Sequence, residues 1–98
     1  MKRIYKYPLP LRLLANGNTY IYIDMRMPEG AKVIHVHDQF GDPCLWALVA
    51  NDKQTTRRFQ IFGTGDLIND EGLKYLGTAH CGMLVWHVFE VLNLPRAE

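Results

Sequence analysis

Short hydrophobic runs separated by turn-forming residues dominate the pattern of this chain. Runs rich in β-branched and aromatic side chains occupy residues 2–7, 19–27, 55–63, 74–79 and 83–91, and two more lie within residues 32–50. Gly, Pro, Asn or Asp residues stand between them. Strands of this composition and spacing are typical of antiparallel sandwiches and small barrels, so we expect six or seven strands.

The type of secondary structure is not decided by the sequence pattern in two segments. Residues 11–15 fit either a strand or one helical turn, and the strong turn signal Asn16-Gly17-Asn18 follows them. Residues 67–73 are too short and too glycine-broken for a long helix, so a helical turn or a structured loop is expected there.

The central element is a hairpin within residues 32–50. Its second strand, 44–49 (CLWALV), has no polar position that could leave one side wet, so we expect a central strand covered on both faces. The connecting loop is either Phe40-Gly41 or Gly41-Asp42. In both registers one wholly hydrophobic face forms the predicted core, with Ile34, Val36, Leu45, Ala47 and Val49. The opposite face carries Val33, His35, His37, Cys44, Trp46 and Leu48.

Alternation assigns faces to two other strands. In residues 19–27 the drier face holds Ile21, Ile23, Met25 and Met27, and the wetter face holds Tyr20, Tyr22, Asp24 and Arg26. In residues 55–63, Arg57 shares a face with Phe59 and Ile61. The last two strands are expected to be neighbours, joined by a turn at His80-Cys81-Gly82.

The fold class expected from these elements is all-β, or β-rich α+β. We predict a small antiparallel sandwich or barrel-like sheet with at most a short helical turn. A chain of 98 residues suits one domain, here residues 1–98. Residues 92–98 are predicted to form a flexible tail interrupted by Pro95.

Composition excludes several classes. Hydrophobic residues make up 48% and charged residues 21% of the chain, which indicates a globular protein with no apolar run long enough for a membrane span. Prolines and Arg12 interrupt any signal-like N-terminus, so we expect a cytoplasmic location with Cys44 and Cys81 reduced. A net charge of +1 argues against a dedicated duplex-DNA binder.

The histidines are the most specific chemical signal. His35 and His37 lie two residues apart on a strand, which places their side chains on one face about 6 to 7 Å apart, and Cys44 lies on that face of the next strand. A third metal ligand would have to come from His80, Cys81 or His87. Because no carboxylate or second spaced ligand set accompanies the pair, half-exposed sheet residues are the preferred interpretation and no metal site is assigned.

No catalytic group is predicted. Cys81 beside His80, with Asp66 or Asp70 elsewhere, has the residue types of a nucleophile, base and orienting group. Their spacing selects no such arrangement, and no predicted helix N-terminus would activate the thiol. We therefore expect a protein without enzymatic activity and without a cofactor.

Binding residues are predicted from exposed aromatic and basic side chains. Tyr20, Tyr22 and Arg26 fit a protein-binding surface, because Tyr and Arg are enriched in binding hot spots. Trp46 and His35 join them if their face of the hairpin is open. Gly63-Thr64-Gly65 with Arg57 and Arg58 would instead suit a small nucleotide, whose phosphates backbone amides and guanidinium groups can bind.

The chain also resembles a family of small, uncharacterised tailed-phage and prophage proteins. The resemblance rests on residues 2–9 (KRIYKYPL), 27–31 (MPEGA), 43–49 (PCLWALV), 63–65 (GTG), 75–78 (YLGT) and 87–90 (HVFE). It covers nearly the whole chain. The stretch at residues 13–20 is longer than the corresponding stretch of the family pattern, and His37 is not part of that pattern. It implies a phage-encoded accessory protein acting in the host cytoplasm, where small phage proteins often block host machinery such as CRISPR complexes or cyclic-nucleotide signalling.

Three functions follow as hypotheses. The first is a non-enzymatic protein that binds a host protein, as an inhibitor of a defence system such as CRISPR. The second is a nucleotide-sequestering anti-defence protein, and the third is a metal-dependent enzyme that uses His35 and His37. Edge strands near the N-terminus also make a homodimer by strand pairing conceivable.

Overall fold

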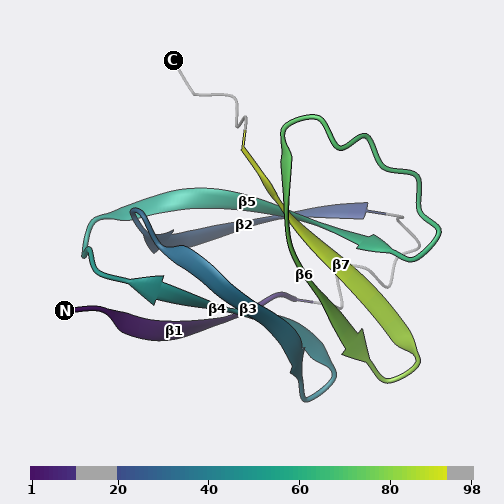
Figure 1. The fold of residues 1–98 in the computed structure, drawn as a ribbon, viewed down its shortest axis with the longest axis horizontal. Helices are drawn as coiled ribbons and strands as arrows, with labels where there is room; N and C mark the ends of the chain where they lie inside the picture. Colours follow the sequence, from purple (N-terminus) through teal and green to yellow (C-terminus); the bar gives the residue numbers. More distant parts are fainter. Residues whose placement is uncertain (11–19, 93–98) are drawn as a thin grey trace.

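Two antiparallel sheets that share one hydrophobic core make up the fold of the computed structural model, which describes residues 1–10 and 20–92 (Figure 1). The strands are β1 (Arg3–Pro8), β2 (Tyr20–Pro28), β3 (Lys32–Gln39), β4 (Asp42–Val49), β5 (Gln54–Gly63), β6 (Leu73–Cys81) and β7 (Leu84–Val91). One sheet has the order β1-β4-β3 and the other β2-β5-β7-β6. The described residues contain no helix, so the predicted all-β class and the strand number are confirmed.

The hairpin of β3 and β4 is the centre of the three-stranded sheet. β4 lies between β1 and β3, and Leu45, Ala47 and Val49 on its inner face are buried, as predicted. Gln39 pairs with Asp42, so the loop is Phe40-Gly41. Both loop residues have positive φ, 54° and 91°, which matches the twist that a two-residue loop needs between right-twisted strands.

The predicted faces of β3 are wrong at Ile34, which was assigned to the core, and at Val33, which was assigned to the opposite face. Val33 pairs with Ala47 but His35 pairs with Trp46, because a β-bulge at Ile34 inserts one extra residue into β3. Val33 and Val36 therefore both pack toward the core, whereas Ile34 is 45% exposed. Alternation cannot show such a bulge, since it assumes a period of two throughout.

The inner face of the four-stranded sheet supplies the other half of the core. Ile23 and Met27 of β2 and Phe59 and Ile61 of β5 are buried there, in agreement with the predicted faces. Val88 of β7 is buried beside them. Opposite them lie the buried hydrophobic residues of β3 and β4, so both sheets are amphipathic layers around one core.

The connections differ in character. β6 and β7 form a hairpin in which Cys81 pairs with Leu84, so the predicted turn is wrong: His80 and Cys81 belong to β6, and the loop is Gly82-Met83. β5 and β6 are joined by residues 64–72, an irregular segment that fits the predicted loop (Figure 1, green). The open question over residues 11–15 and most of the predicted tail, residues 93–98, lie outside the described residues. The described residues include no helix that could span a membrane.

Candidate functional site

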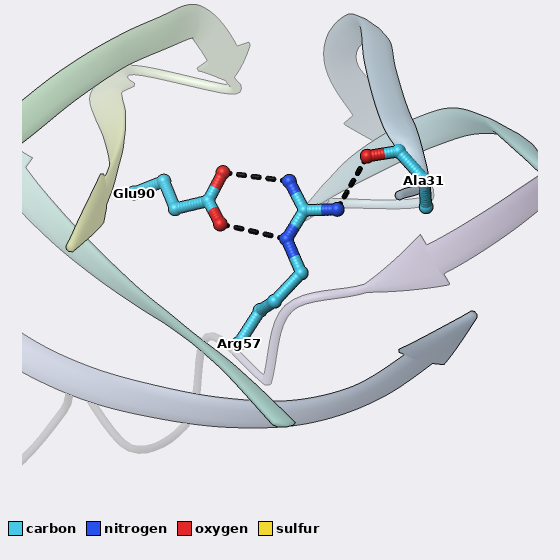
Figure 2. A network of polar contacts seen from close by, with 3 residues as sticks. All are labelled: Ala31, Arg57 and Glu90. Atoms are coloured by element: carbon cyan, nitrogen blue, oxygen red, sulfur yellow. Dashed lines mark hydrogen bonds and ion pairs between the residues drawn. The ribbon is translucent and has the colours of Figure 1, made fainter. Parts of the chain in front are cut away.

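Arg57 lies between the sheets rather than on the surface. Its Nε and Nη2 donate to the two carboxylate oxygens of Glu90 at 2.6 and 2.7 Å, and its Nη1 donates to the carbonyl oxygen of Ala31 (Figure 2). The side chains of Arg57 and Glu90 are only 18% and 11% exposed. Arg57 shares the interior face of β5 with Phe59 and Ile61, so its guanidinium binds groups within the protein rather than a ligand at the surface.

The outer face of the four-stranded sheet carries aligned aromatic residues. One register row across the sheet is Tyr22 (β2), Gln60 (β5), Phe89 (β7) and Tyr75 (β6). In the next row Phe62 pairs with the backbone of both Tyr20 and His87. Together Tyr22, Phe62, Tyr75 and Phe89 form the aromatic face.

Phe89 contacts two other rings of the aromatic face edge to face. Phe89 lies at the centre, with centroid distances of 5.5 Å to Phe62 and 5.4 Å to Tyr75. Such pairs are the favoured arrangement of aromatic quadrupoles. Phe62 is buried, whereas Tyr22 and Tyr75 at the two edge strands are 51% and 56% exposed. The face thus presents one accessible tyrosine on each edge strand, with Phe62 and Phe89 on the two strands between them.

Arg58 borders this face and has two partners. Its Nε and Nη2 donate to the carboxylate of Asp24 at 2.7 and 3.1 Å, and its guanidinium lies 5.2 Å from the centroid of the Tyr22 ring. The hydrogen bonds from Arg58 lower the pKa of Asp24 below its usual range. Unlike Arg57, Arg58 stays at the surface, where a partner molecule can reach it.

Residues 64–72 form a wall beside the aromatic face. A hollow of about 310 Å³ lies between Tyr22 and Phe62 on one side and Leu67 and Glu71 on the other. Leu67 is 93% exposed, so a large hydrophobic side chain stands at the rim. Isolated exposed hydrophobic residues are common on protein surfaces, but one beside exposed aromatic rings adds to a continuous patch.

His87 holds this wall to the sheet. Its Nε2 is hydrogen-bonded to the hydroxyl of Thr64 at 2.8 Å and its Nδ1 to that of Thr78 at 3.1 Å. The Thr78 hydroxyl is also hydrogen-bonded to the Tyr75 hydroxyl at 2.5 Å. The network orients Tyr75 and the start of the loop together.

The outer face of the three-stranded sheet holds the predicted histidines. His35 and His37 are exposed, and their rings stack at 5.6 Å with an interplanar angle of 18°. Trp46 is half-buried, with its ring 5.8 Å from that of His35. Cys44 pairs with His37 in register but is buried, and burial raises the pKa of its thiol. Within residues 1–10 and 20–92, no group of three or more His, Cys, Asp or Glu side chains could hold a metal ion.

Cys81 does not have the surroundings of a nucleophile. Burial and a hydrogen bond to Asp38 raise the pKa of its thiol to about 12. Asp66, one predicted orienting group, instead accepts a hydrogen bond from the backbone N–H of Gly63 at 2.7 Å. A buried, protonated thiol reacts slowly, because the thiolate is the reactive species.

The residues of the nucleotide alternative do not converge. Arg57 is bound to Glu90 in the interior, and Arg58 lies five residues along β5 from Gly63, about 16 Å in an extended strand. The Asp66 carboxylate also lies beside the amide that would meet a phosphate. The described residues therefore do not bring these groups together.

The predicted site residues separate into three places. Tyr22, Arg26 and Arg58 belong to the four-stranded sheet, Trp46 and His35 lie on the outer face of the other sheet, and Arg57 is inside. Tyr20 is described by its backbone alone, within β2.

Sequence reasoning missed Phe62, Tyr75 and Phe89. Phe59 was predicted to face inward, so alternation along β5 places Phe62 on the outer face. This pattern could have identified Phe62, but not Tyr75 or Phe89. Which strands adjoin β5 could not be read from that pattern.

These features define a small two-sheet β-protein with surface patches of aromatic, basic and histidine side chains and no described metal cluster. The chain belongs to the family "Domain of unknown function (DUF7352)", whose model matches residues 1–97. No curated protein and no solved structure was found to match it.

Proposed function

We propose that this domain is a non-enzymatic binding protein whose aromatic face docks on a partner protein. The observation that carries the proposal is the row Tyr22–Gln60–Phe89–Tyr75, which spans all four strands and exposes a tyrosine at each edge. Tyrosine offers a large contact area with few rotatable bonds, so ordering it on binding costs little entropy.

The border of the aromatic face supports a protein partner. Arg58 and Asp24 provide charges of both signs beside Tyr22, and the hollow next to Leu67 can accept a partner side chain. Protein interfaces combine a desolvated hydrophobic centre with a polar rim of this kind. A phosphate-rich ligand would instead favour a surface of uniformly positive charge.

The proposal extends to the kind of partner. The resemblance to small tailed-phage and prophage proteins supports a phage-encoded accessory protein that acts in the host cytoplasm. Its partner would be a host protein, and a defence complex such as a CRISPR effector is the proposed target. Binding over the aromatic face would inhibit that complex by occupying its surface, without chemistry.

The test is partner capture from host lysate with tagged full-length protein and a face-specific variant. Tyr22→Ser with Leu67→Ser removes two exposed side chains that line the same hollow. Tyr5→Ser with Met83→Ser is the matched control, because it removes two exposed side chains elsewhere. We expect one stoichiometric partner with the wild type and the control, and its loss with the Tyr22/Leu67 variant.

Two results would overturn the proposal. One is the absence of any specific stoichiometric partner in repeated captures. The other is a partner retained by the Tyr22/Leu67 variant at wild-type yield. Circular dichroism and urea unfolding of each variant would establish that all compared proteins are folded.

A further inference from the structure

We propose that the outer face of the three-stranded sheet is a second docking surface, which takes an acidic segment of a partner protein and binds it more tightly as the pH falls. This histidine face consists of His35, His37, Trp46, Lys6 and Lys32. It lies on the opposite side of the sandwich from the aromatic face, so the proposal is independent of the proposed function.

Register brings the members of the histidine face together from three strands. Lys6 of β1 pairs with Trp46 of β4, which pairs with His35 of β3. In the adjacent row Leu48 pairs with Lys32. A half-buried tryptophan therefore lies between a lysine and a histidine, an arrangement that provides an aromatic anchor with cationic groups on both sides.

The two imidazoles are placed to respond to a bound anion. Their stacking at 5.6 Å means that two protonated rings would repel each other in the free protein. His37 Nδ1 donates to the carbonyl oxygen of Asp38 at 2.9 Å, so Nε2 is the atom that can gain a proton. A carboxylate beside the pair offsets the repulsion and favours protonation, and by linkage protonation favours the carboxylate.

With the histidines protonated, the charged side chains around the histidine face include more cations than carboxylates. The cations are Lys6 and Lys32, and the two carboxylates nearby are Asp38 and Asp42 at the hairpin end. Asp38 accepts hydrogen bonds from the Gly41 N–H and from the inward-facing Cys81 thiol, so it is engaged away from the imidazoles. Asp42 is exposed beyond Cys44, at the loop. Lysine and histidine charges thus outnumber the single free carboxylate.

The surface favours an acidic protein segment over a nucleic acid strand. Single-stranded nucleic acid is bound by successive stacking platforms along a basic groove. The histidine face has one tryptophan, and the exposed side chains near it include the aliphatic Ile4 and Ile34. Carboxylates interspersed with aliphatic side chains match that mixture of cations and hydrophobic area.

The experiment is an NMR titration of the isotope-labelled full-length protein with a short glutamate-rich peptide that contains two leucines. Histidine gains its charge between pH 8 and 5, whereas glutamate stays ionised there, so spectra are compared at about pH 5.5 and about pH 7.5. We expect shifts centred on Lys6, His35 and Trp46. We also expect a dissociation constant about fivefold lower at the lower pH, as two weak surface ion pairs would give.

Two matched variants separate charge from structure. His35→Gln with His37→Gln keeps polar side chains of similar length but cannot gain charge, so the pH dependence should vanish. His80→Gln removes an exposed histidine of β6, on the other sheet, and should leave the pH dependence intact. The Tyr22/Leu67 variant should bind this peptide as the wild type does.

Four results would overturn the proposal. They are no shifts at millimolar peptide at the lower pH, shifts centred on the aromatic face, an unchanged pH dependence in the His35/His37 variant, and tighter binding of a single-stranded oligonucleotide than of the peptide to these residues. None of them bears on the capture experiment with the aromatic face.

Discussion

Gly77 of β6 lies directly against Val36 of β3, across the interface between the two sheets. A Cβ atom on Gly77 would stand 2.7 Å from the Val36 Cβ and 3.0 Å from its Cγ2. The backbone at Gly77 is not in the positive-φ region, so space rather than conformation requires glycine. β3 and β6 are edge strands of their sheets, and each has a bulge beside this contact, at Ile34 and at Leu76. Bulges bend a strand and increase its local twist.

Gly77→Ala should destabilise the protein by about 1–3 kcal/mol, because the methyl group meets a buried, β-branched side chain that has no room to move. Urea unfolding followed by circular dichroism measures this change. Gly63→Ala is the matched control: its Cβ would make ordinary contacts at 3.5 Å, and the free energy of unfolding should change by less than about 1 kcal/mol. Equal effects of the two substitutions would contradict the close approach.

Glu90→Gln should cost about 3 kcal/mol of folding free energy. The substitution leaves the Arg57 guanidinium largely buried without a counter-charge, which is the expensive way to break an internal ion pair. Asp24→Asn is the control, since it breaks an Arg–carboxylate pair of similar geometry that is exposed to solvent. Chemical unfolding of both variants should show a much larger loss for Glu90→Gln, and a reversed order would refute the internal role of Arg57.

The Asp24–Arg58 pair should contribute a small acid-dependent component to stability. The pKa of Asp24 is lowered in the folded protein, so this contribution is present above the unfolded value of about 3.9 and is lost as the pH falls through the folded value. The free energy of unfolding, measured with urea, should fall less steeply between about pH 5 and about pH 3 for Asp24→Asn than for the wild type. Parallel curves would show that the pair does not persist in solution.

Both thiols should be protected from labelling in the native protein. Cys44 and Cys81 are buried with raised pKa values, so a thiol reagent at about pH 8 should modify neither until urea unfolds the chain. Rapid native labelling of either cysteine would contradict their placement.

A second consequence concerns alkaline conditions. The pKa of Cys81 is raised to about 12, so the folded protein retains a proton that the unfolded chain releases near its ordinary value of about 8.5. Stability is therefore complete below about pH 8.5 and falls as the pH rises toward the folded value. Cys81→Ala should flatten this alkaline decline, and an unchanged slope would assign it to other groups.

Several elements were predictable because they depend on local composition. The strands, the β3–β4 hairpin and the buried faces of β2 and β5 follow from period-two alternation and turn residues. The tyrosine and arginine side chains of the candidate site were also identified, and Tyr22 and Arg58 do lie in contact at the surface. The exposed His35 and His37 pair was placed on one face, as the structure has it.

Other features were wrong or missed because they depend on contacts between distant segments. Ile34 was assigned to the core, since no local pattern indicates the bulge in β3, which lies beside the contact of Val36 with Gly77 of β6. Arg57 was taken as a binding residue, although its face is interior and its partner Glu90 lies 33 residues away. The aromatic face could not be predicted without knowing which strands lie next to β5, and alternation does not show the order of strands in a sheet.

The sequence by itself determined which residues form strands and which side of most strands is hydrophobic, because the backbone geometry of a strand repeats every two residues. The tertiary structure alone decided how seven described strands divide into two sheets, and therefore which polar side chains face water. Arg57 and Arg58 show the difference most directly: adjacent in the chain, they point to opposite sides of β5, and only packing of the second sheet makes one internal and leaves the other exposed.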